Sequence, residues 1–182
     1  TYQSVSGKSG AAVIELVEQF TAALEGRPID LDKFPHQMAF NVAFDWPFVS
    51  SGDSEEEIKM VNETQKILED KTIGVSATTV RVPVLYAHSE SINVETENKL
   101  SADEARQLLS ASPGIVVVDD PANRKYPLAV DVAGRDEVCV GRIREDASIQ
   151  NGLNLWVVAD NLRKGAALNA IQIAELLGRI NV

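Results

Sequence analysis

The chain has 182 residues, of which 45% are hydrophobic and 24% are charged, and its net charge is −10. This length and composition predict a folded protein with a substantial core and exclude a disordered chain. The negative charge disfavours nucleic acid and anionic membrane surfaces as partners. No segment has the roughly 18 apolar residues of a membrane span. The single cysteine, Cys139, cannot form an internal disulfide, which fits a reducing cytoplasm.

The first half of the chain shows two helical and two extended patterns. Residues 9–25 carry apolar side chains at steps of three and four, which predict a helix. Residues 38–44 are apolar and aromatic enough for a short buried strand. Ser54 and Glu57 match a capping box, so a second helix is expected to begin there. The valine-rich residues 76–85 predict a strand with Pro83 at an edge or bulge.

The second half of the chain is richer in strands. A strand is predicted at 91–96, followed by a helix from Ser101 to about Ser110 that begins with a capping box to Glu104. Further strands are predicted at 115–118, 137–144 and 153–159, with an Asn151-Gly152 turn between the last two. A helix is predicted at 164–180. This order lacks the strict alternation of a parallel α/β fold. We therefore expect an α+β fold with a mixed, largely antiparallel sheet and helices on one face, in one domain over residues 1–182.

A few residues could carry chemistry. Glu56 and Lys59 lie three apart on one predicted helix, a spacing typical of a surface ion pair. Arg81 and His88 are seven apart, which places them on opposite faces of a regular strand. They can share a site only if the strand bends or ends between them. No group of histidine, cysteine and carboxylate side chains has the spacing of a metal site, so no metal is expected.

Five segments in this order resemble the C-terminal domain of aspartate-semialdehyde dehydrogenase. They are residues 1–7 (TYQSVSG), 56–68 (EEIKMVNETQKIL), 81–88 (RVPVLYAH), 141–144 (GRIR) and 160–167 (DNLRKGAA). The resemblance covers the whole chain and implies a fold like the C-terminal domain of glyceraldehyde-3-phosphate dehydrogenase. It also implies an NADP-dependent enzyme that interconverts L-aspartyl 4-phosphate and L-aspartate 4-semialdehyde. That reaction belongs to the cytoplasmic biosynthesis of lysine, diaminopimelate, methionine and threonine.

The resemblance assigns roles to individual residues. His88 matches the general acid/base, because an imidazole can exchange a proton with a thiol near neutral pH. Arg81 matches the clamp on the substrate's α-carboxylate, and Glu56 matches the acceptor of its α-ammonium group. The remaining matches are Lys59 for phosphate, Gln3 for substrate orientation, and Ser6, Gly7 and Asn161 for the NADP site.

The resemblance also implies parts that this chain does not contain. The family's nucleophilic cysteine precedes the motif at residues 1–7 and attacks the carbonyl before hydride and phosphate transfer, and Cys139 does not match its position. The glycine-rich NADP-binding domain would lie further upstream. We therefore expect a fragment that is inactive alone. It should still form a homodimer, because this domain carries the subunit interface in the family.

Two alternatives remain open. One is a non-catalytic dimerisation module or an inactive paralogue, against which the joint presence of Glu56, Lys59, Arg81 and His88 argues. The other is a related reductase that acts on an N-acetylglutamyl phosphate. An acetylated amine offers no ammonium group to Glu56, which disfavours this second alternative.

Overall fold

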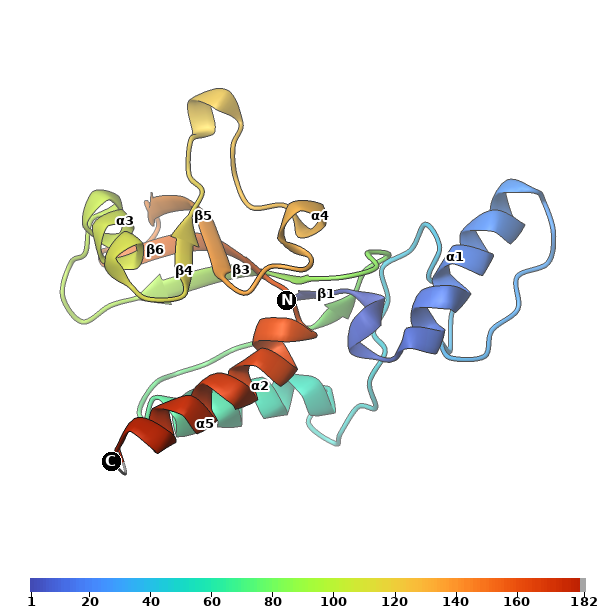
Figure 1. The fold of residues 1–182 in the computed structure, drawn as a ribbon, viewed down its shortest axis with the longest axis horizontal. Helices are drawn as coiled ribbons and strands as arrows, with labels where there is room; N and C mark the ends of the chain where they lie inside the picture. Colours follow the sequence, from blue (N-terminus) through green and yellow to red (C-terminus); the bar gives the residue numbers. More distant parts are fainter. Residues whose placement is uncertain (181–182) are drawn as a thin grey trace. The chain divides into compact units, whose positions relative to one another are not determined.

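The computed structural model describes residues 1–180, and the chain divides into two compact units, Thr1–Leu85 and Tyr86–Val182 (Figure 1). Each unit contains both helices and strands, and each is described in turn below. Among the described residues, no helix is both long enough and apolar enough to cross a membrane.

Two helices dominate the first unit. Helix α1 spans Gly10–Leu24, and the Ser9 side chain caps its start by accepting a hydrogen bond from the Ala12 backbone N–H. Helix α2 spans Glu55–Ile67 and begins with the expected capping box, in which Ser54 and Glu57 each accept the other's backbone N–H. Both predicted helices are confirmed.

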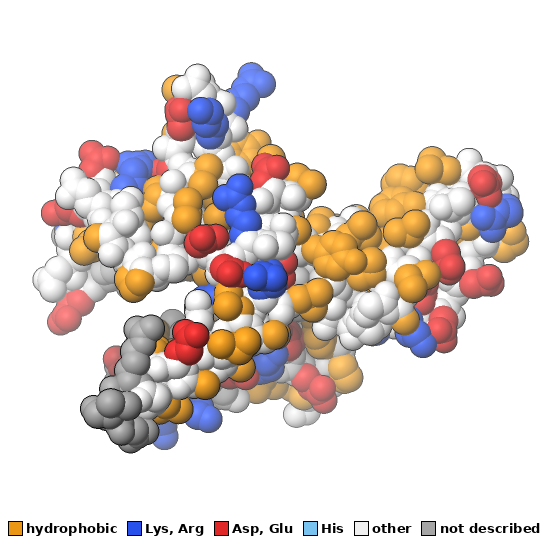
Figure 2. Space-filling view, in the orientation of Figure 1, with side chains coloured by type: hydrophobic (Ala, Val, Ile, Leu, Met, Phe, Trp, Pro, Cys, Tyr) orange, Lys and Arg blue, Asp and Glu red, His pale blue; other side chains and the backbone are white. Residues whose placement is uncertain are grey.

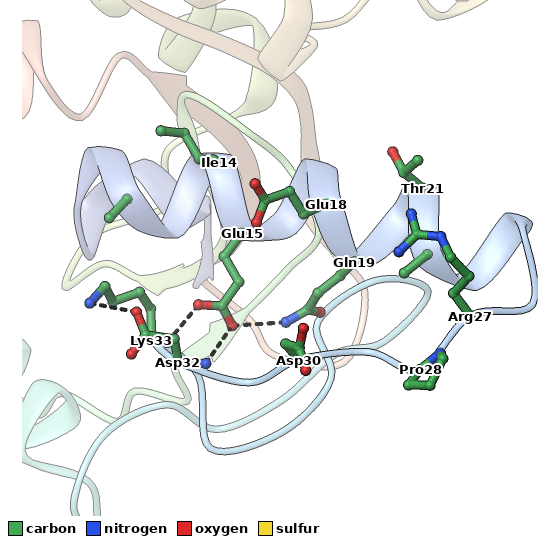
Figure 3. Close-up of a pocket in the computed structure, with 12 residues that line it drawn as sticks. Ile14, Glu15, Glu18, Gln19, Thr21, Arg27, Pro28, Asp30, Asp32 and Lys33 are labelled. Carbon is green, nitrogen blue, oxygen red and sulfur yellow. Dashed lines mark hydrogen bonds and ion pairs between the residues drawn. The ribbon is translucent and has the colours of Figure 1, made fainter.

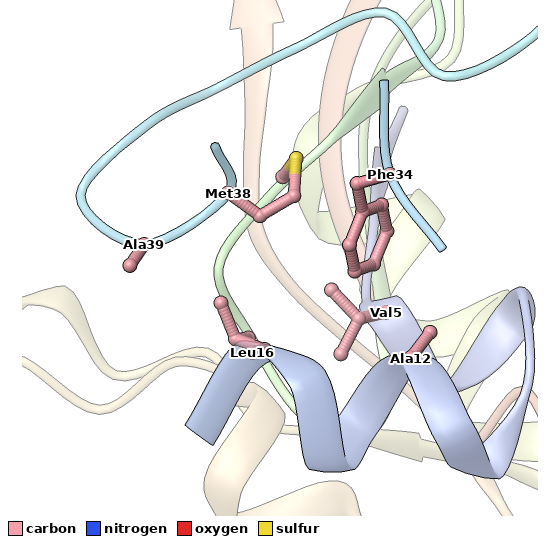
Figure 4. Packing of buried hydrophobic residues seen from close by; sticks show 6 residues of the cluster. All are labelled: Val5, Ala12, Leu16, Phe34, Met38 and Ala39. Carbon is pink, nitrogen blue, oxygen red and sulfur yellow. The ribbon is translucent and has the colours of Figure 1, made fainter. Parts of the chain in front are cut away.

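The core of the first unit lies between α1 and the segments on either side of it (Figure 4). Its fully buried members are Val5, Ala12, Leu16, Phe34, Met38 and Ala39. The predicted strand at residues 38–44 is wrong. The side-chain oxygen of Gln19 accepts the backbone N–H groups of Met38 and Ala39, so these donors do not face a neighbouring strand. Phe40 then turns the chain with a φ of 60°.

The strands of the first unit are short. Strand β1 (Tyr2–Gln3) pairs in parallel with β2 (Val80–Arg81), with Gln3 opposite Arg81. The strand predicted over residues 76–85 is therefore only two residues long, and it ends shortly before Pro83, which has no N–H to continue the pairing. A 3₁₀ turn at Val5–Gly7 follows β1 and leads into α1.

The second unit contains a four-stranded mixed sheet. Its strands, in the spatial order β3–β6–β5–β4, are β3 (His88–Glu95), β6 (Gly152–Ala159), β5 (Val138–Asp146) and β4 (Ile115–Val117). Strand β6 is antiparallel to both β3 and β5, and β4 is parallel to β5. The expected mixed, largely antiparallel sheet is confirmed. The hairpin between β5 and β6 is also present, but Asp146 pairs with Gly152, so its loop is longer than a two-residue turn.

Helices cover both faces of this sheet, whereas the sequence predicted helices on one face only. Helix α3 (Ala102–Ala111), which begins with the predicted capping box, packs on the face that carries Val140. The short helix α4 (Ala129–Val132) packs on the opposite face with Cys139, because neighbouring residues of a strand point to opposite sides. The remaining helical segments are a 3₁₀ turn at Pro121–Asn123, a π-helical turn at Arg163–Ala167 and helix α5 at Leu168–Ile180.

Candidate active site

Glu56 is the centre of a polar cluster in the first unit. Its carboxylate accepts a hydrogen bond from Gln3 Nε2 at 3.1 Å and pairs with Lys59 Nζ at 3.1 and 3.2 Å. The capping box fixes Glu56 in the first turn of α2, where the helix dipole favours a negative charge. The Glu56 side chain is 17% exposed, so its carboxylate remains within reach of a ligand.

Arg81 lies opposite Gln3 in the β1–β2 pair, and its side chain is only 3% exposed. Its Nε donates to Asp45 Oδ2 at 3.2 Å, and its Nη1 donates to the Ser4 carbonyl at 2.8 Å. The Trp46 ring covers the guanidinium group at 4.4 Å. Among the described residues, none accepts a hydrogen bond from Nη2, which leaves that end of the guanidinium group available to an anion.

The charges of this cluster balance one another. Burial lowers the pKa of Arg81, while the nearby carboxylates of Asp45 and Glu56 oppose that shift. Arg81 therefore keeps its positive charge near the Glu56 carboxylate, which also contacts Gln3 and Lys59. The Lys59 side chain is 53% exposed, and an ion pair with an exposed lysine is weak, so a ligand can replace Lys59 beside Glu56 at little cost. The cluster can thus hold an ammonium group, a carboxylate and a further anion.

The residues predicted to line a cofactor site lie in two places. Ser6 and Gly7 belong to the 3₁₀ turn after β1, where Ser6 is buried with its Oγ 3.0 Å from Ser4 Oγ and Gly7 is exposed. A ligand can therefore approach the Gly7 backbone more easily than the Ser6 hydroxyl. Asn161 lies in the second unit, where its Oδ1 accepts the backbone N–H of Ala87 at 3.1 Å.

His88 is the first residue of β3 and is half-buried. It is fixed by pairing with Ala159 of β6 and by the preceding residue, Ala87, which is fully buried with a φ of 68°. A left-handed conformation is unfavourable for alanine, so the Asn161 contact to its N–H helps to hold this bend. Strand β2, which carries Arg81, ends at that residue, and His88 begins a separate strand. The opposite-face placement expected for one continuous strand therefore does not apply to these two residues.

A pocket of about 570 Å³ in the first unit contains none of the predicted site residues. It lies between α1 and the chain that follows it (Figure 3). The Glu15 carboxylate at this pocket accepts the backbone N–H groups of Asp32 and Lys33 and the side-chain amide of Gln19. These contacts hold the loop against α1, which explains the buried carboxylate without a ligand.

Comparison with known proteins decides the family. The family model described as semialdehyde dehydrogenase, dimerisation domain, matches residues 1–164. This chain belongs to the semialdehyde dehydrogenase dimerisation-domain family. The predicted resemblance is thereby confirmed.

Several relatives of this dimerisation domain are aspartate-semialdehyde dehydrogenases. Aspartate-semialdehyde dehydrogenase of Aquifex aeolicus is 52% identical over 97% of this chain and 53% of its own length. The crystal structure of aspartate semialdehyde dehydrogenase II from Vibrio cholerae, complexed with ASA, is 47% identical with a TM-score of 0.94 and covers 98% of this chain and 53% of that one. The Candida albicans enzyme, solved with NADP, is 28% identical with a TM-score of 0.61. The match covers 95% of this chain and 57% of that one. The chain spans about half the length of the curated relatives it matches.

Sequence reasoning singled out Gln3, Glu56, Lys59 and Arg81 but missed Asp45. Gln3, Glu56 and Lys59 form one contact network, and Arg81 lies opposite Gln3. Asp45 lies in the irregular chain between α1 and α2, where no periodic pattern or motif marks it. Only its long-range contacts, with Arg81 and Lys8, connect it to the candidate site, and such contacts leave no local signal.

Proposed function

We propose that this chain is the C-terminal substrate-binding and dimerisation domain, residues 1–182, of an NADP-dependent aspartate-semialdehyde dehydrogenase. The complete enzyme interconverts L-aspartyl 4-phosphate and L-aspartate 4-semialdehyde in the cytoplasm, on the route to lysine, diaminopimelate, methionine and threonine. The observation that carries the proposal is the presence in the first unit of both a partly exposed Glu56 carboxylate and an Arg81 guanidinium group whose Nη2 has no described protein acceptor.

These two groups match the two charges of an amino-acid substrate. The Nη2 end of Arg81 donates to the α-carboxylate, and the Glu56 carboxylate accepts from the α-ammonium group. Neither charge changes during the reaction, so this part of the site binds substrate and transition state alike. An N-acetylated substrate would place a neutral amide against Glu56 and leave the carboxylate without its cationic partner. The cluster therefore favours a free amino acid over an acetylated one.

Lys59 and Gln3 complete the substrate cluster. The Lys59 ammonium group is half exposed, so it can release Glu56 to the substrate and pair with phosphate instead. Gln3 contacts Glu56 through one amide hydrogen, which leaves its other polar positions for orienting the substrate. We assign Lys59 to phosphate and Gln3 to substrate orientation on these contacts and on the family match.

His88 acts as the general acid/base in this proposal. The nucleophilic cysteine belongs to the part of the enzyme outside this chain. His88 accepts the thiol proton as the sulfur attacks the aldehyde carbon, and in the reverse direction it returns that proton to the leaving thiolate. Its fixed place at the start of β3 suits this role, because proton transfer requires a well-oriented imidazole ring.

NADP accepts or delivers the hydride when it is bound, and a relative solved with NADP supports this choice of cofactor. The exposed Gly7 backbone fits an anionic dinucleotide at one edge of its site. Ser6 holds the turn from inside, and Asn161 holds the backbone before His88. The glycine-rich part of the NADP site belongs to the remaining half of the enzyme.

Exposed apolar side chains support a homodimer. Helix α5 exposes Ile171, Ile173, Leu176 and Leu177, and Figure 2 shows hydrophobic side chains on this helix and also in the region of α1. Patches of this kind mark surfaces that other parts of a protein cover. The matching family is itself described as a dimerisation domain, so a second copy of the chain is the partner we propose.

The test is made in the full-length protein and uses the only two histidines of this chain. The wild-type protein should reduce NADP with aspartate semialdehyde and phosphate. His88→Ala should lower kcat by about 10²- to 10⁴-fold, the usual contribution of a general acid/base. His36→Ala, at an exposed loop position, is the matched control and should leave kcat unchanged. A wild-type protein without turnover would favour the non-catalytic module, and normal turnover in His88→Ala would remove His88 from the mechanism.

A further inference from the structure

Asp45 is a buried carboxylate to which the proposed mechanism gives no role. Its side chain is only 2% exposed although it lies in an irregular segment of the first unit. The adjacent backbone is fixed by two hydrogen bonds between Ala43 and Arg81, of 3.1 and 2.8 Å. The carboxylate is thereby held at the side chain of the same arginine.

Asp45 contacts two cations, one with each oxygen atom. Its Oδ2 accepts from Arg81 Nε at 3.2 Å, and its Oδ1 accepts from Lys8 Nζ at 2.6 Å. A buried carboxylate with two cationic partners is well compensated, whereas either cation would lose its partner if the carboxylate were removed. Arg81 is almost completely buried, and Lys8 is 30% exposed.

These contacts fix the orientation of Arg81. Asp45 holds the Nε edge, the Ser4 carbonyl holds Nη1, and the Trp46 ring lies over the guanidinium plane. A planar group that is fixed at one edge, at one nitrogen and on one face has a defined direction for its remaining donors. Nη2 is the nitrogen that remains for a ligand.

The same contacts anchor the turn that carries Ser6 and Gly7. Arg81 holds this turn at its beginning, through the Ser4 carbonyl, and Asp45 holds the residue after its end, Lys8. The exposed Gly7 backbone lies between these two anchors. The orientation of the arginine and the position of the turn therefore depend on one carboxylate.

We propose that Asp45 is a positioning residue that couples the substrate-binding Arg81 to the cofactor-side turn Val5–Gly7 through its shared contacts with Arg81 and Lys8. This inference rests on the proposed function, which supplies the substrate for Arg81 and the cofactor for the turn. Asp45 touches neither ligand in this account. It fixes both the direction of Arg81 Nη2 and the position of the Gly7 backbone. Loss of its charge therefore weakens the binding of the substrate and of the cofactor.

The test is Asp45→Asn in the full-length enzyme, which keeps the size of the side chain and removes its charge. The KM for aspartate semialdehyde should rise by about 10-fold or more, because small displacements of a binding group have large effects. The KM for NADP should rise by several-fold. The kcat should change by less than about threefold, because uniform binding affects KM alone. Asp53→Asn, at an exposed aspartate whose carboxylate accepts a hydrogen bond from the Ser51 hydroxyl in the loop before α2, should change none of these constants.

A second variant separates the coupling from a general loss of structure. Lys8→Met removes the partly exposed cation and should raise the KM for NADP by several-fold while Arg81 keeps its partner. In the double variant Asp45→Asn/Lys8→Met, the KM for NADP should rise no further than in Asp45→Asn alone, because both changes break one contact.

The outcomes distinguish this inference from the proposed function. Turnover in the wild-type enzyme with unchanged KM values in Asp45→Asn would overturn the role of Asp45 and leave the function intact. A rise confined to one of the two KM values, or additive effects in the double variant, would also overturn the coupling. A wild-type enzyme that does not convert aspartate semialdehyde would overturn both proposals.

Discussion

In the first unit the proposed site residues are held by one another, whereas in the second unit they are held by the backbone. Gln3 contacts Glu56, which is remote in the sequence, and Arg81 likewise contacts the remote Asp45. His88 owes its place to strand pairing with Ala159 and to the bend at Ala87.

The difference predicts where each unit is sensitive to substitution. A network of charged side chains fails when one partner is removed, because the remaining charge is left buried and uncompensated. A residue placed by strand pairing is sensitive to any change that moves the strands. Ligand binding should therefore respond to charge changes in the first unit, and stability should respond to backbone changes in the second.

The largest effect on stability is expected from a substitution in the sheet of the second unit. Gly141 lies in β5, and a Cβ atom there would be 2.1 Å from the Val118 carbonyl oxygen and 2.6 Å from Pro127 Cδ. Both are too close for the strand to keep its place. Gly141→Ala should lower the free energy of unfolding by about 2–4 kcal/mol in urea titrations.

Gly178→Ala in α5 is the matched control, because a Cβ at that position meets nothing within 4 Å. Alanine is the better helix former, so this variant should be as stable as the wild type or slightly more stable. A Gly141→Ala protein with wild-type stability would contradict the claim that close strand contacts fix this sheet.

A smaller effect on stability is expected from the capping boxes, one of which lies in each unit. The capping box of α2 is buried, and its Glu57 also accepts the backbone N–H of Thr79 at 2.8 Å, which ties the helix to the segment before β2. The capping box of α3, at Ser101, bonds only within itself. Ser54→Ala should cost about 1–2 kcal/mol of unfolding free energy, and Ser101→Ala should cost less. Equal losses in the two variants would show that burial adds nothing to the motif.

The pH dependence of this comparison has a definite sign. The N–H groups of Ser54 and Thr79 stabilise the Glu57 carboxylate and lower its pKa from the ordinary value of 4.5. A lowered pKa in the folded state stabilises the protein above the ordinary pKa, and that contribution is lost as the pH falls through the lowered value. The stability difference between the wild type and Glu57→Gln should therefore be largest near neutral pH and decrease in acid.

Local patterns identified the elements whose cause is local. The capping boxes at Ser54 and Ser101 and the apolar spacing of α1 depend on residues within one or two turns, and each appears as expected. The strand predicted at residues 38–44 failed because the Gln19 side chain, outside that segment, takes its backbone donors. Asp45 was missed for the same reason, since its partners are remote in the sequence. The four proposed substrate residues were assigned by their family motifs, because spacing alone predicted no more than an ion pair at Glu56.

The central claim is that Arg81 and Glu56 hold the two charges of one amino-acid ligand, and a crystal structure of the full-length His88→Ala enzyme with aspartate semialdehyde tests it most directly. The account predicts the α-carboxylate within hydrogen-bond distance of Arg81 Nη2 and the α-ammonium group within hydrogen-bond distance of the Glu56 carboxylate. A ligand bound through other residues, with Arg81 contacting only Asp45 and Ser4, would contradict it.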